Sequence, residues 1–308
     1  MRIRLESEDG ALSPILGPLD TPGLAPGSRL HALVKNCLVR RNPIVKGAGV
    51  SGVYWPAEYF GLNHSSLFRS LNGDQQGAIL GQCSHQLLQE AYYVEKSGSQ
   101  FTAKMSLLAG TTEERMLFSL IAADEAAHLY SVRSFLTQEP AAHQELPFLK
   151  LLADIIENSS RMTLVFVVQV VLEGWGITHY RGLLERCCDP DLKAVLQEIL
   201  NDEYKHHGSG VVLLSEGQLS AREKHEITET MVRFLEMVAV GPTGVVQVVE
   251  QNCQGLGTEA RKALYEDLRS EETTREKLDL LKKLMAQPGV LDIVEALDKK
   301  GCFEPRLN

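Results

Sequence analysis

The sequence predicts an all-α protein on the basis of three observations. From about residue 74 to residue 300, one helix-period pattern of apolar residues follows another, and no convincing segment alternates with period two. Of the 308 residues, 44% are hydrophobic and 23% charged, which provides ample material for a buried core. Capping signals, including Thr111 or Thr112 and the pair Asp189-Pro190, divide the pattern into discrete helices.

Residues 1–72 are rich in Gly, Pro and Ser and predict a loop-rich N-terminal extension that packs on the helical part. Short helices are expected within it, near 29–40 and 56–71. A basic cluster also lies here and has two open interpretations, a contact for an anionic ligand or partner and a solvated loop. The cluster consists of Arg40, Arg41 and Lys46.

Four long helices are predicted within residues 73–218. They span about 74–97, 111–137 and 150–187, the last with a break near Asn158, and a fourth starts after Asp189-Pro190. Residues 219–308 are expected to add C-terminal helices to the same domain. These helices are predicted at about 219–240, 243–254, 258–286 and 289–299.

Each of the four long helices places a glutamate on its apolar stripe, and two of them add a histidine one turn later. A carboxylate that faces a core is costly unless it is paired, protonated or bound to a cation. Residues three apart share one face of a helix, so each Glu-x-x-His pair can reach the same small volume. The residues concerned are Glu90, Glu125 with His128, Glu173, and Glu203 with His206.

The spacing of these residues predicts that they meet at one level. Glu90 and Glu125 are 35 positions apart (125 − 90), and Glu173 and Glu203 are 30 apart (203 − 173), which suits two antiparallel helical hairpins. Glu95, about 140° further round the first helix, is expected to point elsewhere. Four carboxylates and two imidazoles at one depth would balance two divalent cations, and such ligands suit iron or manganese more than copper. The alternative is a bundle with partly exposed glutamates and two hydrogen-bonded core histidines.

This arrangement resembles the ferritin-like di-iron carboxylate superfamily, in which two helices give a glutamate each and two give Glu-x-x-His. The segments "DEAAH" (124–128) and "DEYKHHG" (202–208) look like the two iron motifs of acyl-carrier-protein desaturases. The ligand set also resembles that of hydroxylases and ribonucleotide reductase small subunits. Ile199 stands where arylamine N-oxygenases carry an additional histidine, so the signature of that subgroup is absent.

The resemblance covers about residues 75–215 and implies a ferritin-like four-helix bundle that holds two metal ions. By this resemblance Glu125 and Glu203 bridge the two ions. Each ion then has two terminal ligands, which are Glu90 with His128 and Glu173 with His206.

Residues beside the implied ligands have further candidate roles. Asp124 and Asp202 either accept the far N–H of a ligand histidine from a neighbouring helix or face solvent. Tyr180 is a candidate for packing or hydrogen bonding beside the ligands, and a less favoured one for supplying an electron. Gly174 and Gly176 either leave room for substrate or dioxygen or allow close helix packing.

The function expected from this site is an oxidase or oxygenase that uses dioxygen and two iron ions. Manganese or a mixed Mn/Fe pair are the other metal options. The substrate is expected to be a small or carrier-tethered organic molecule that is hydroxylated, desaturated or N-oxidised. No flavin, haem or Fe–S motif is visible, so an external electron donor is expected. Two alternatives stay open: a ferroxidase or iron-binding protein without organic substrate, and a metal-free helical interaction protein.

Composition argues against other classes. The net charge of −9 disfavours binding to nucleic acid or an anionic membrane surface. The run "MTLVFVVQVVLEGWGI" is interrupted by Gln169 and Glu173, which favours a buried core helix over a membrane span. The six cysteines form no CxxC motif, and the N-terminal residues have no apolar signal region, so a cytoplasmic location is predicted. A homodimer is one option for the C-terminal helices.

Overall fold

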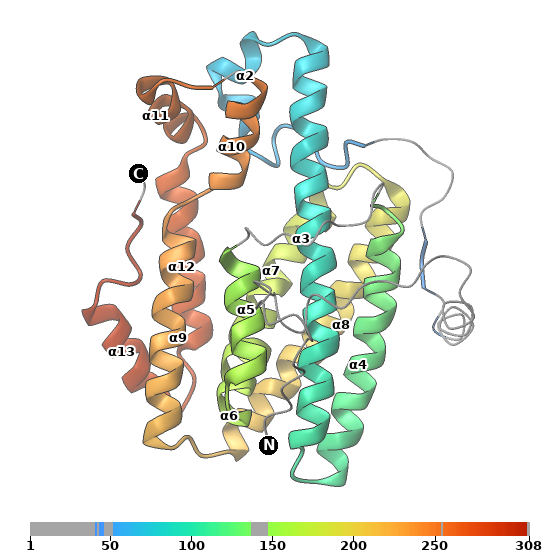
Figure 1. Ribbon diagram of the computed structural model, residues 1–308, viewed down its shortest axis with the longest axis vertical. Helices are drawn as coiled ribbons and strands as arrows, with labels where there is room; N and C mark the ends of the chain where they lie inside the picture. The colour runs from blue at the N-terminus through green and yellow to red at the C-terminus, as the bar shows by residue number, and fades with distance from the viewer. Residues whose placement is uncertain (1–40, 42, 46–51, 137–146, 254, 307–308) are drawn as a thin grey trace, which may run out of the picture.

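The computed structural model describes residues 41, 43–45, 52–136, 147–253 and 255–306 (Figure 1). Every regular element in these ranges is a helix, and no strand occurs among them, so the predicted all-α class is confirmed for this part of the chain. The helix expected at 29–40 lies outside the described residues. The one expected at 56–71 consists of two short elements, η2 (Leu62–His64) and α2 (Ser66–Ser70).

The first long hairpin is formed by α3 (Gly73–Leu108) and α4 (Thr112–Arg133). Asn72 and Gln75 begin α3 with a reciprocal capping box, and the Thr111 side chain accepts from the Glu114 backbone N–H at the start of α4. Helix α3 runs past the predicted end at residue 97. The Thr102 hydroxyl donates to the carbonyl of Gly98, so this polar stretch bonds to its own helix and does not end it.

The second long hairpin is formed by α7 (Glu173–Arg186) and α8 (Pro190–Glu216), and α7 is the last part of a segment that the structure divides into several helices. The predicted helix 150–187 is split into α5 (Pro147–Asn158), α6 (Arg161–Leu164), the π-helix η3 (Val165–Leu172) and α7. The break at Asn158 is the predicted one. Helix α8 begins as predicted, with the Asp189 side chain accepting from the Leu192 backbone N–H.

In the described residues after α8, the helices are α9 (Ala221–Ala239), α10 (Thr243–Asn252), α11 (Thr258–Asp267), α12 (Ser270–Met285) and α13 (Leu291–Lys299). The prediction of a single helix at 258–286 is wrong. Arg269, between α11 and α12, has φ 52°, which lies outside the right-handed helical region.

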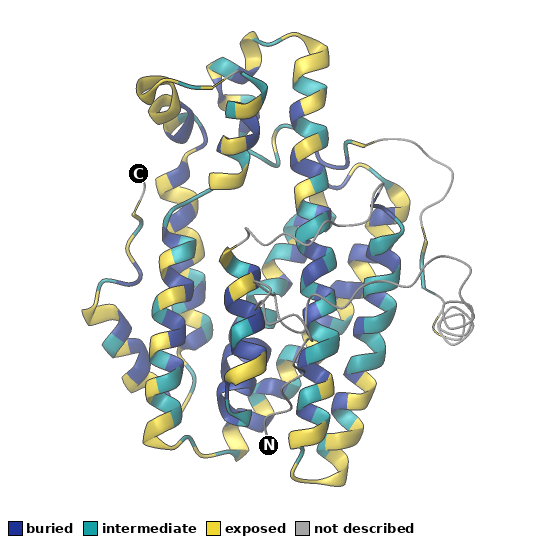
Figure 2. Cartoon of the chain, viewed as in Figure 1, coloured by how far each residue is buried: buried dark blue, intermediate teal, exposed yellow. Residues whose placement is uncertain are grey.

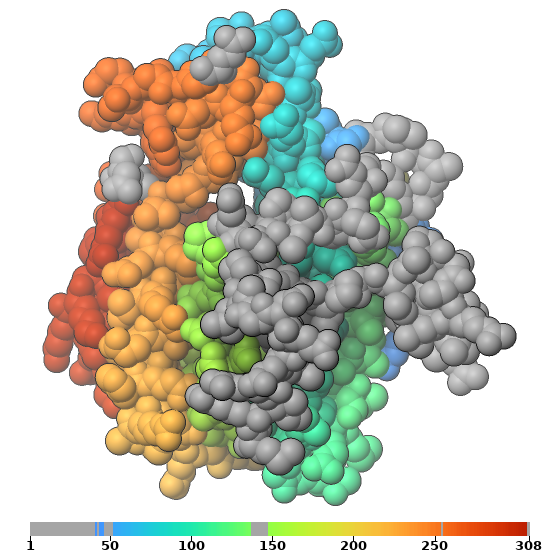
Figure 3. All heavy atoms as spheres, in the orientation of Figure 1, coloured from blue at the N-terminus to red at the C-terminus, as the bar shows by residue number. Residues whose placement is uncertain are grey.

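Helices α3, α4, α7 and α8 are connected by direct packing. Helix α3 packs against α4, α4 against α8, and α8 against both α7 and η3 (Figure 1). Helix α9 packs on α5, α12 and α13, and α10 packs on α3. Figure 3 shows the orange atoms of α9 and α10 beside the green atoms of α5 and the teal atoms of α3. Among the described residues, the largest apolar cluster joins α3, α4 and η3 to α9 and α12, and it includes Phe101, Phe118, Phe166, Phe234 and Leu278. Buried and exposed positions alternate along these helices (Figure 2).

Two stretches, Arg161–Arg186 and Ala221–Asn252, are long and apolar enough to cross a membrane by length and composition alone. This is weak evidence, because a core helix of a soluble protein meets the same criteria. In the first stretch 67% of the apolar window is buried inside the protein, as expected of a core helix. The cysteines in the described ranges are free thiols. The cytoplasmic location stays a prediction.

Candidate metal centre

Helices α4 and α8 each direct a glutamate and a histidine into the interior. On α4, Glu125 and His128 are both 4% exposed, and on α8, Glu203 and His206 are 6% and 1% exposed. The ring centroids of His128 and His206 are 6.3 Å apart. The two Glu-x-x-His segments therefore face each other across the space between their helices.

Helices α3 and α7 each add one further carboxylate, Glu95 and Glu173. Ligand atoms of Glu95, Glu125, His128 and Glu203 lie within 4.8 Å of one another, and so do those of Glu173, Glu203 and His206. Glu203 belongs to both groups, so the groups adjoin. Each group has enough donors to hold a metal ion.

The structure places Glu95, and not Glu90, beside the two histidines. The buried stripe of α3 passes through Ser84, Leu88, Ala91 and Glu95 with spacings of four, three and four, whereas the predicted stripe through Glu90 is out of phase with it. Glu90 belongs to neither group of potential ligands. The expectation that Glu95 points elsewhere is wrong.

A signal for Glu95 was present in the sequence. Glu95 and Glu125 are 30 positions apart (125 − 95), the same gap that separates Glu173 from Glu203. The midpoints of the two gaps, 110 and 188, fall in the turns between α3 and α4 and between α7 and α8. Equal arms of a hairpin bring side chains level, so the matched spacing favours Glu95.

His128 is held from both sides of its ring. Its Nδ1 lies 3.2 Å from Glu95 Oε2, and its Nε2 lies 3.2 Å from Asp202 Oδ2. Asp202 in turn accepts from Lys205 Nζ at 2.6 Å, and the Tyr180 hydroxyl donates to Glu95 Oε1. Asp202 and Tyr180 therefore hydrogen-bond to His128 and Glu95 and help to fix the orientation of these two potential ligands.

His206 has a similar environment. Its Nδ1 lies 3.2 Å from Glu125 Oε1 and its Nε2 lies 3.7 Å from Asp124 Oδ2. Arg41 Nη1 donates to Asp124 Oδ1 at 2.5 Å, whereas Arg40 and Lys46 of the basic cluster lie outside the described residues. In both cases Nδ1 faces a glutamate of the centre, and Nε2 faces an aspartate of the neighbouring helix that is paired with a cation.

Burial raises the pKa of Glu125, Glu173 and Glu203 above the usual range for glutamate. Repulsion adds to the effect of burial, since Glu203 raises the pKa of Glu173. Burial lowers the pKa of His206, but the nearby Asp124 and Glu125 carboxylates outweigh it and raise the value to about 11. The raised pKa values share one cause, which is an excess of negative charge in a buried site. Bound protons or cations would balance that charge.

The donor set fits a pair of divalent cations. Four ionised carboxylates and two neutral imidazoles carry four negative charges, which two divalent cations balance. Within the described part of the chain, Glu173 Oε2 and both ring nitrogens of His206 are buried without a hydrogen-bond partner, because the contacts of His206 do not meet hydrogen-bond geometry. Buried polar atoms without partners are costly, and coordination would satisfy the oxygen and one of the two nitrogens. Carboxylate oxygen and imidazole nitrogen together suit Fe²⁺ and Mn²⁺.

Gly98 makes room for the centre and was missed in the sequence. A Cβ atom at this position would lie 2.2 Å from Glu125 Oε2 and 2.6 Å from Glu125 Cδ. Gly98 follows Glu95 by three positions and so continues the buried stripe of α3. A glycine on that stripe, in register with a glutamate of the next helix, was the available signal.

A cavity of about 100 Å³ adjoins the carboxylates. Its wall includes Glu95, Glu125, Glu173 and Glu203 and is otherwise mostly apolar. The apolar lining residues are Ala91, Val94, Phe148, Leu152, Val168, Leu172 and Trp175.

The two glycines beside Trp175 have different roles. Gly176 lines the cavity, and a Cβ atom there would stand 3.7 Å from Glu203 Oε2. At Gly174 a Cβ atom would meet His207 and Leu284 at 2.9 Å. Gly176 thus leaves space beside the centre, and Gly174 allows close packing.

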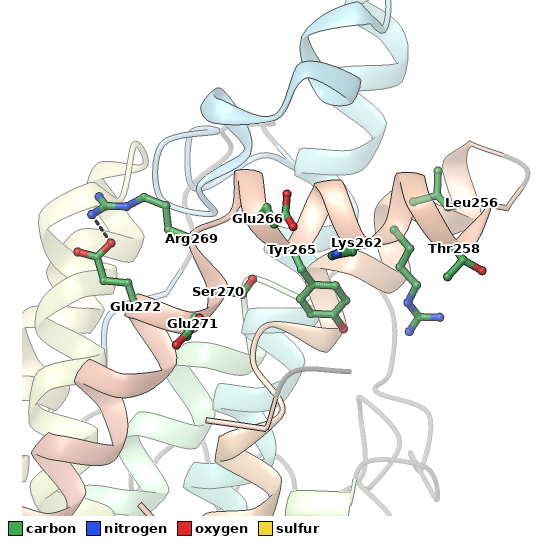
Figure 4. A pocket seen from close by; sticks show the side chains of 10 residues that line it. Leu256, Thr258, Lys262, Tyr265, Glu266, Arg269, Ser270, Glu271 and Glu272 are labelled. Atoms are coloured by element: carbon green, nitrogen blue, oxygen red, sulfur yellow. Dashed lines mark ion pairs between the residues drawn. The ribbon is translucent and has the colours of Figure 1, made fainter. Parts of the chain in front are cut away.

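A larger and more open hollow of about 920 Å³ lies at α11 and the start of α12 (Figure 4). None of the predicted site residues lines it. Its charged lining residues are evenly split between basic and acidic, and Arg269 is paired with Glu272. Among the described residues, no group of potential metal ligands lines this hollow, so the candidate centre is the smaller cavity. The lining residues are Leu256, Thr258, Arg261, Lys262, Tyr265, Glu266, Arg269, Ser270, Glu271 and Glu272.

Comparisons with known proteins give no match to any protein-family model, curated protein or solved structure.

Proposed function

We propose that α3, α4, α7 and α8 form a ferritin-like four-helix bundle that holds two iron ions for the oxidation of an organic substrate by dioxygen. The proposed ligands follow the two groups of buried side chains. Glu95 and His128 would hold one ion, and Glu173 and His206 the other. Glu203 belongs to both groups, and Glu125 belongs to the first and lies 3.2 Å from His206 of the second, so these two glutamates would be available to both ions.

Two ferrous ions at this position would supply the binding and reduction of dioxygen. The residues of the chain have supporting roles. Asp202, 3.2 Å from His128 Nε2, would hold the proton of that nitrogen, and Asp124, 3.7 Å from His206 Nε2, would do the same on a closer approach. Each Nδ1 would then be the nitrogen that faces an ion. Electrons are proposed to come from an external donor.

The observation that supports an organic substrate is the cavity beside the carboxylates. Its walls are mainly aliphatic and aromatic, and they adjoin Glu95, Glu125, Glu173 and Glu203 directly. A site that only takes up and stores iron has no need of an apolar chamber beside its ligands, whereas an oxidase must exclude water and hold a C–H or N–H bond near the metals.

Metal analysis of the full chain after anaerobic loading with Fe²⁺ tests the centre. We expect two iron ions per chain, and we expect Glu203→Ala to lose both because Glu203 belongs to both groups. Glu95→Ala and Glu90→Ala form a matched pair on one helix: the first should lose iron, and the second should retain two ions. Full iron loading of Glu95→Ala, or loss of iron in Glu90→Ala, would contradict the proposed ligand set.

Oxygen consumption separates oxidation of a substrate from iron handling. With two Fe²⁺ per chain and a chemical reductant, an oxidase should consume dioxygen repeatedly once a substrate enters the cavity. If dioxygen is consumed only in proportion to added Fe²⁺, and iron beyond two ions per chain is retained, the protein handles iron and has no organic substrate. Chains that bind no metal would support a purely structural role.

A further inference from the structure

Glu90 lines the same cavity as the proposed iron ligands without being one of them. The cavity is bounded by Glu95, Glu125, Glu173 and Glu203 on one side, and Glu90 is part of the same wall. Glu90 and Glu95 are five residues apart on α3, so the rise of the helix separates them by about 7.5 Å. A ligand that touches Glu90 could therefore place another part of itself beside the centre.

The Glu90 carboxylate has no partner in the described part of the chain. It makes no hydrogen bond and no ion pair there, although Lys277 on α12 is near enough to influence it. Burial raises the pKa of Glu90, and the charge of Lys277 acts in the opposite direction. A half-buried carboxylate that faces a cavity gains most from a ligand that supplies a hydrogen-bond donor or a positive charge.

The charge of the lining favours a cation over an anion. Among the described lining residues there are five glutamates and no lysine or arginine. Two divalent cations would balance the four glutamates of the centre. Glu90 would then be opposed only by the charge of Lys277, which forms no ion pair with it in the described part of the chain. An anionic ligand would therefore be repelled, whereas an ammonium group would be attracted.

The remaining walls set the size and polarity of the ligand. Phe148, Leu152, Leu172 and Trp175 surround the cavity with apolar surface. The volume of about 100 Å³ lies below the range of about 300–1,000 Å³ that is typical for drug-sized ligands. Only a slender body, such as a short alkyl chain, suits this space.

We propose that the cavity binds a small primary amine, with the ammonium group on Glu90 and a short apolar chain that leads to the carboxylate centre. This inference rests on the proposed function and specifies its substrate class. Glu90 is then a specificity-determining residue. The axial rise of about 7.5 Å alone corresponds to roughly five to six bonds of an extended chain, so we expect the carbon to be oxidised at least that far from the nitrogen.

Calorimetric binding of n-pentylamine, n-pentanol and pentanoate to the anaerobic Fe²⁺-loaded chain tests the proposal, because the three probes share length and differ in head-group charge. We expect pentylamine to bind at least about tenfold more tightly than either of the others. Glu90→Gln keeps the shape of the side chain and should remove this preference while iron content stays at two per chain. Asp74→Asn, which removes an exposed carboxylate from the first turn of the same helix, should change neither.

The outcomes separate the two proposals. Equal binding of pentylamine and pentanoate, or an unchanged preference in Glu90→Gln, overturns the amine site even where two iron ions are bound. A chain that binds no iron but prefers pentylamine, with the preference lost in Glu90→Gln, keeps the amine site and refutes the di-iron function.

Discussion

Gly98→Ala tests whether α3 is shaped around the Glu125 carboxylate. The added Cβ would lie 2.2 Å from Glu125 Oε2, and an ordinary contact begins at about 3.4 Å, so the carboxylate must retreat by about 1.2 Å (3.4 − 2.2). Metal–ligand distances in working sites vary by only about 0.2 Å. The displaced carboxylate would therefore cease to be a good ligand for either ion.

The same substitution has an opposite effect on the helix itself. Alanine in a helix interior is more favourable than glycine by about 0.5–1 kcal/mol. We therefore expect the metal-free variant to be about as stable as the parent, since the gain in propensity offsets the shift of one flexible side chain. Iron affinity should fall about 10–100-fold, the range found when the supporting structure of a metal site is altered.

The assay is a competitive Fe²⁺ titration against a chelator, together with urea unfolding of the metal-free protein. Gly77→Ala is the matched control, because Gly77 lies in the same helix and a Cβ atom there meets nothing within 4 Å. It should gain about 0.5–1 kcal/mol of stability and bind iron like the parent. Parental iron affinity in Gly98→Ala would refute the reasoning that links this glycine to the centre.

Three further predictions concern stability. Lys104 Nζ donates to the carbonyls at the end of α5, including that of Ile156 at 2.7 Å, so Lys104→Met should lower the free energy of unfolding by about 2 kcal/mol in urea. A Cβ at Gly210 would lie 2.7 Å from Gln169 Cβ, so Gly210→Ala should lower the free energy of unfolding by about 1–3 kcal/mol, and a melting temperature at or above that of the parent would contradict this. Burial, assisted by the charge of Lys277, lowers the pKa of His179 to about 4. The unfolded chain then binds more protons than the folded chain between pH 4 and 6.5, so stability should fall as pH falls through this window, by no more than about 3 kcal/mol for this group. His179→Gln should flatten that slope relative to the parent, and an identical slope in both would argue against a buried neutral imidazole.

The helical class and most element boundaries were predictable because they depend on local signals. The cap at Asp189 and the break at Asn158 lie where the sequence places them, and of the two caps predicted for α4, Thr111 or Thr112, the structure has Thr111. The sequence did not predict the end of α3 or the division of 258–286, because the first depends on tertiary packing and the second on the backbone conformation of one residue. Helix α3 continues through a Ser- and Gly-containing stretch because Phe101 and Met105 are buried there, and Arg269 divides 258–286 with a left-handed residue that no local pattern announces.

The candidate centre was predictable to the extent that helical periodicity could place its members. The two Glu-x-x-His segments on α4 and α8 have clear apolar stripes, and their four side chains lie together in the structure. On α3 the apolar residues leave the phase ambiguous, since Cys83 and Leu88 are both buried but belong to different stripes. Only the partner helix decides which of Glu90 and Glu95 faces inward, and that information is not local.

The symmetry of the two hairpins determines how the chain can tolerate changes in length. One extra residue in the turn between α3 and α4, or between α7 and α8, alters neither the direction nor the height of any ligand. One extra residue between Glu95 and the end of α3 would rotate all that follows by about 100° relative to that glutamate. Insertions should therefore be harmless at the tips of the hairpins and damaging anywhere along their arms.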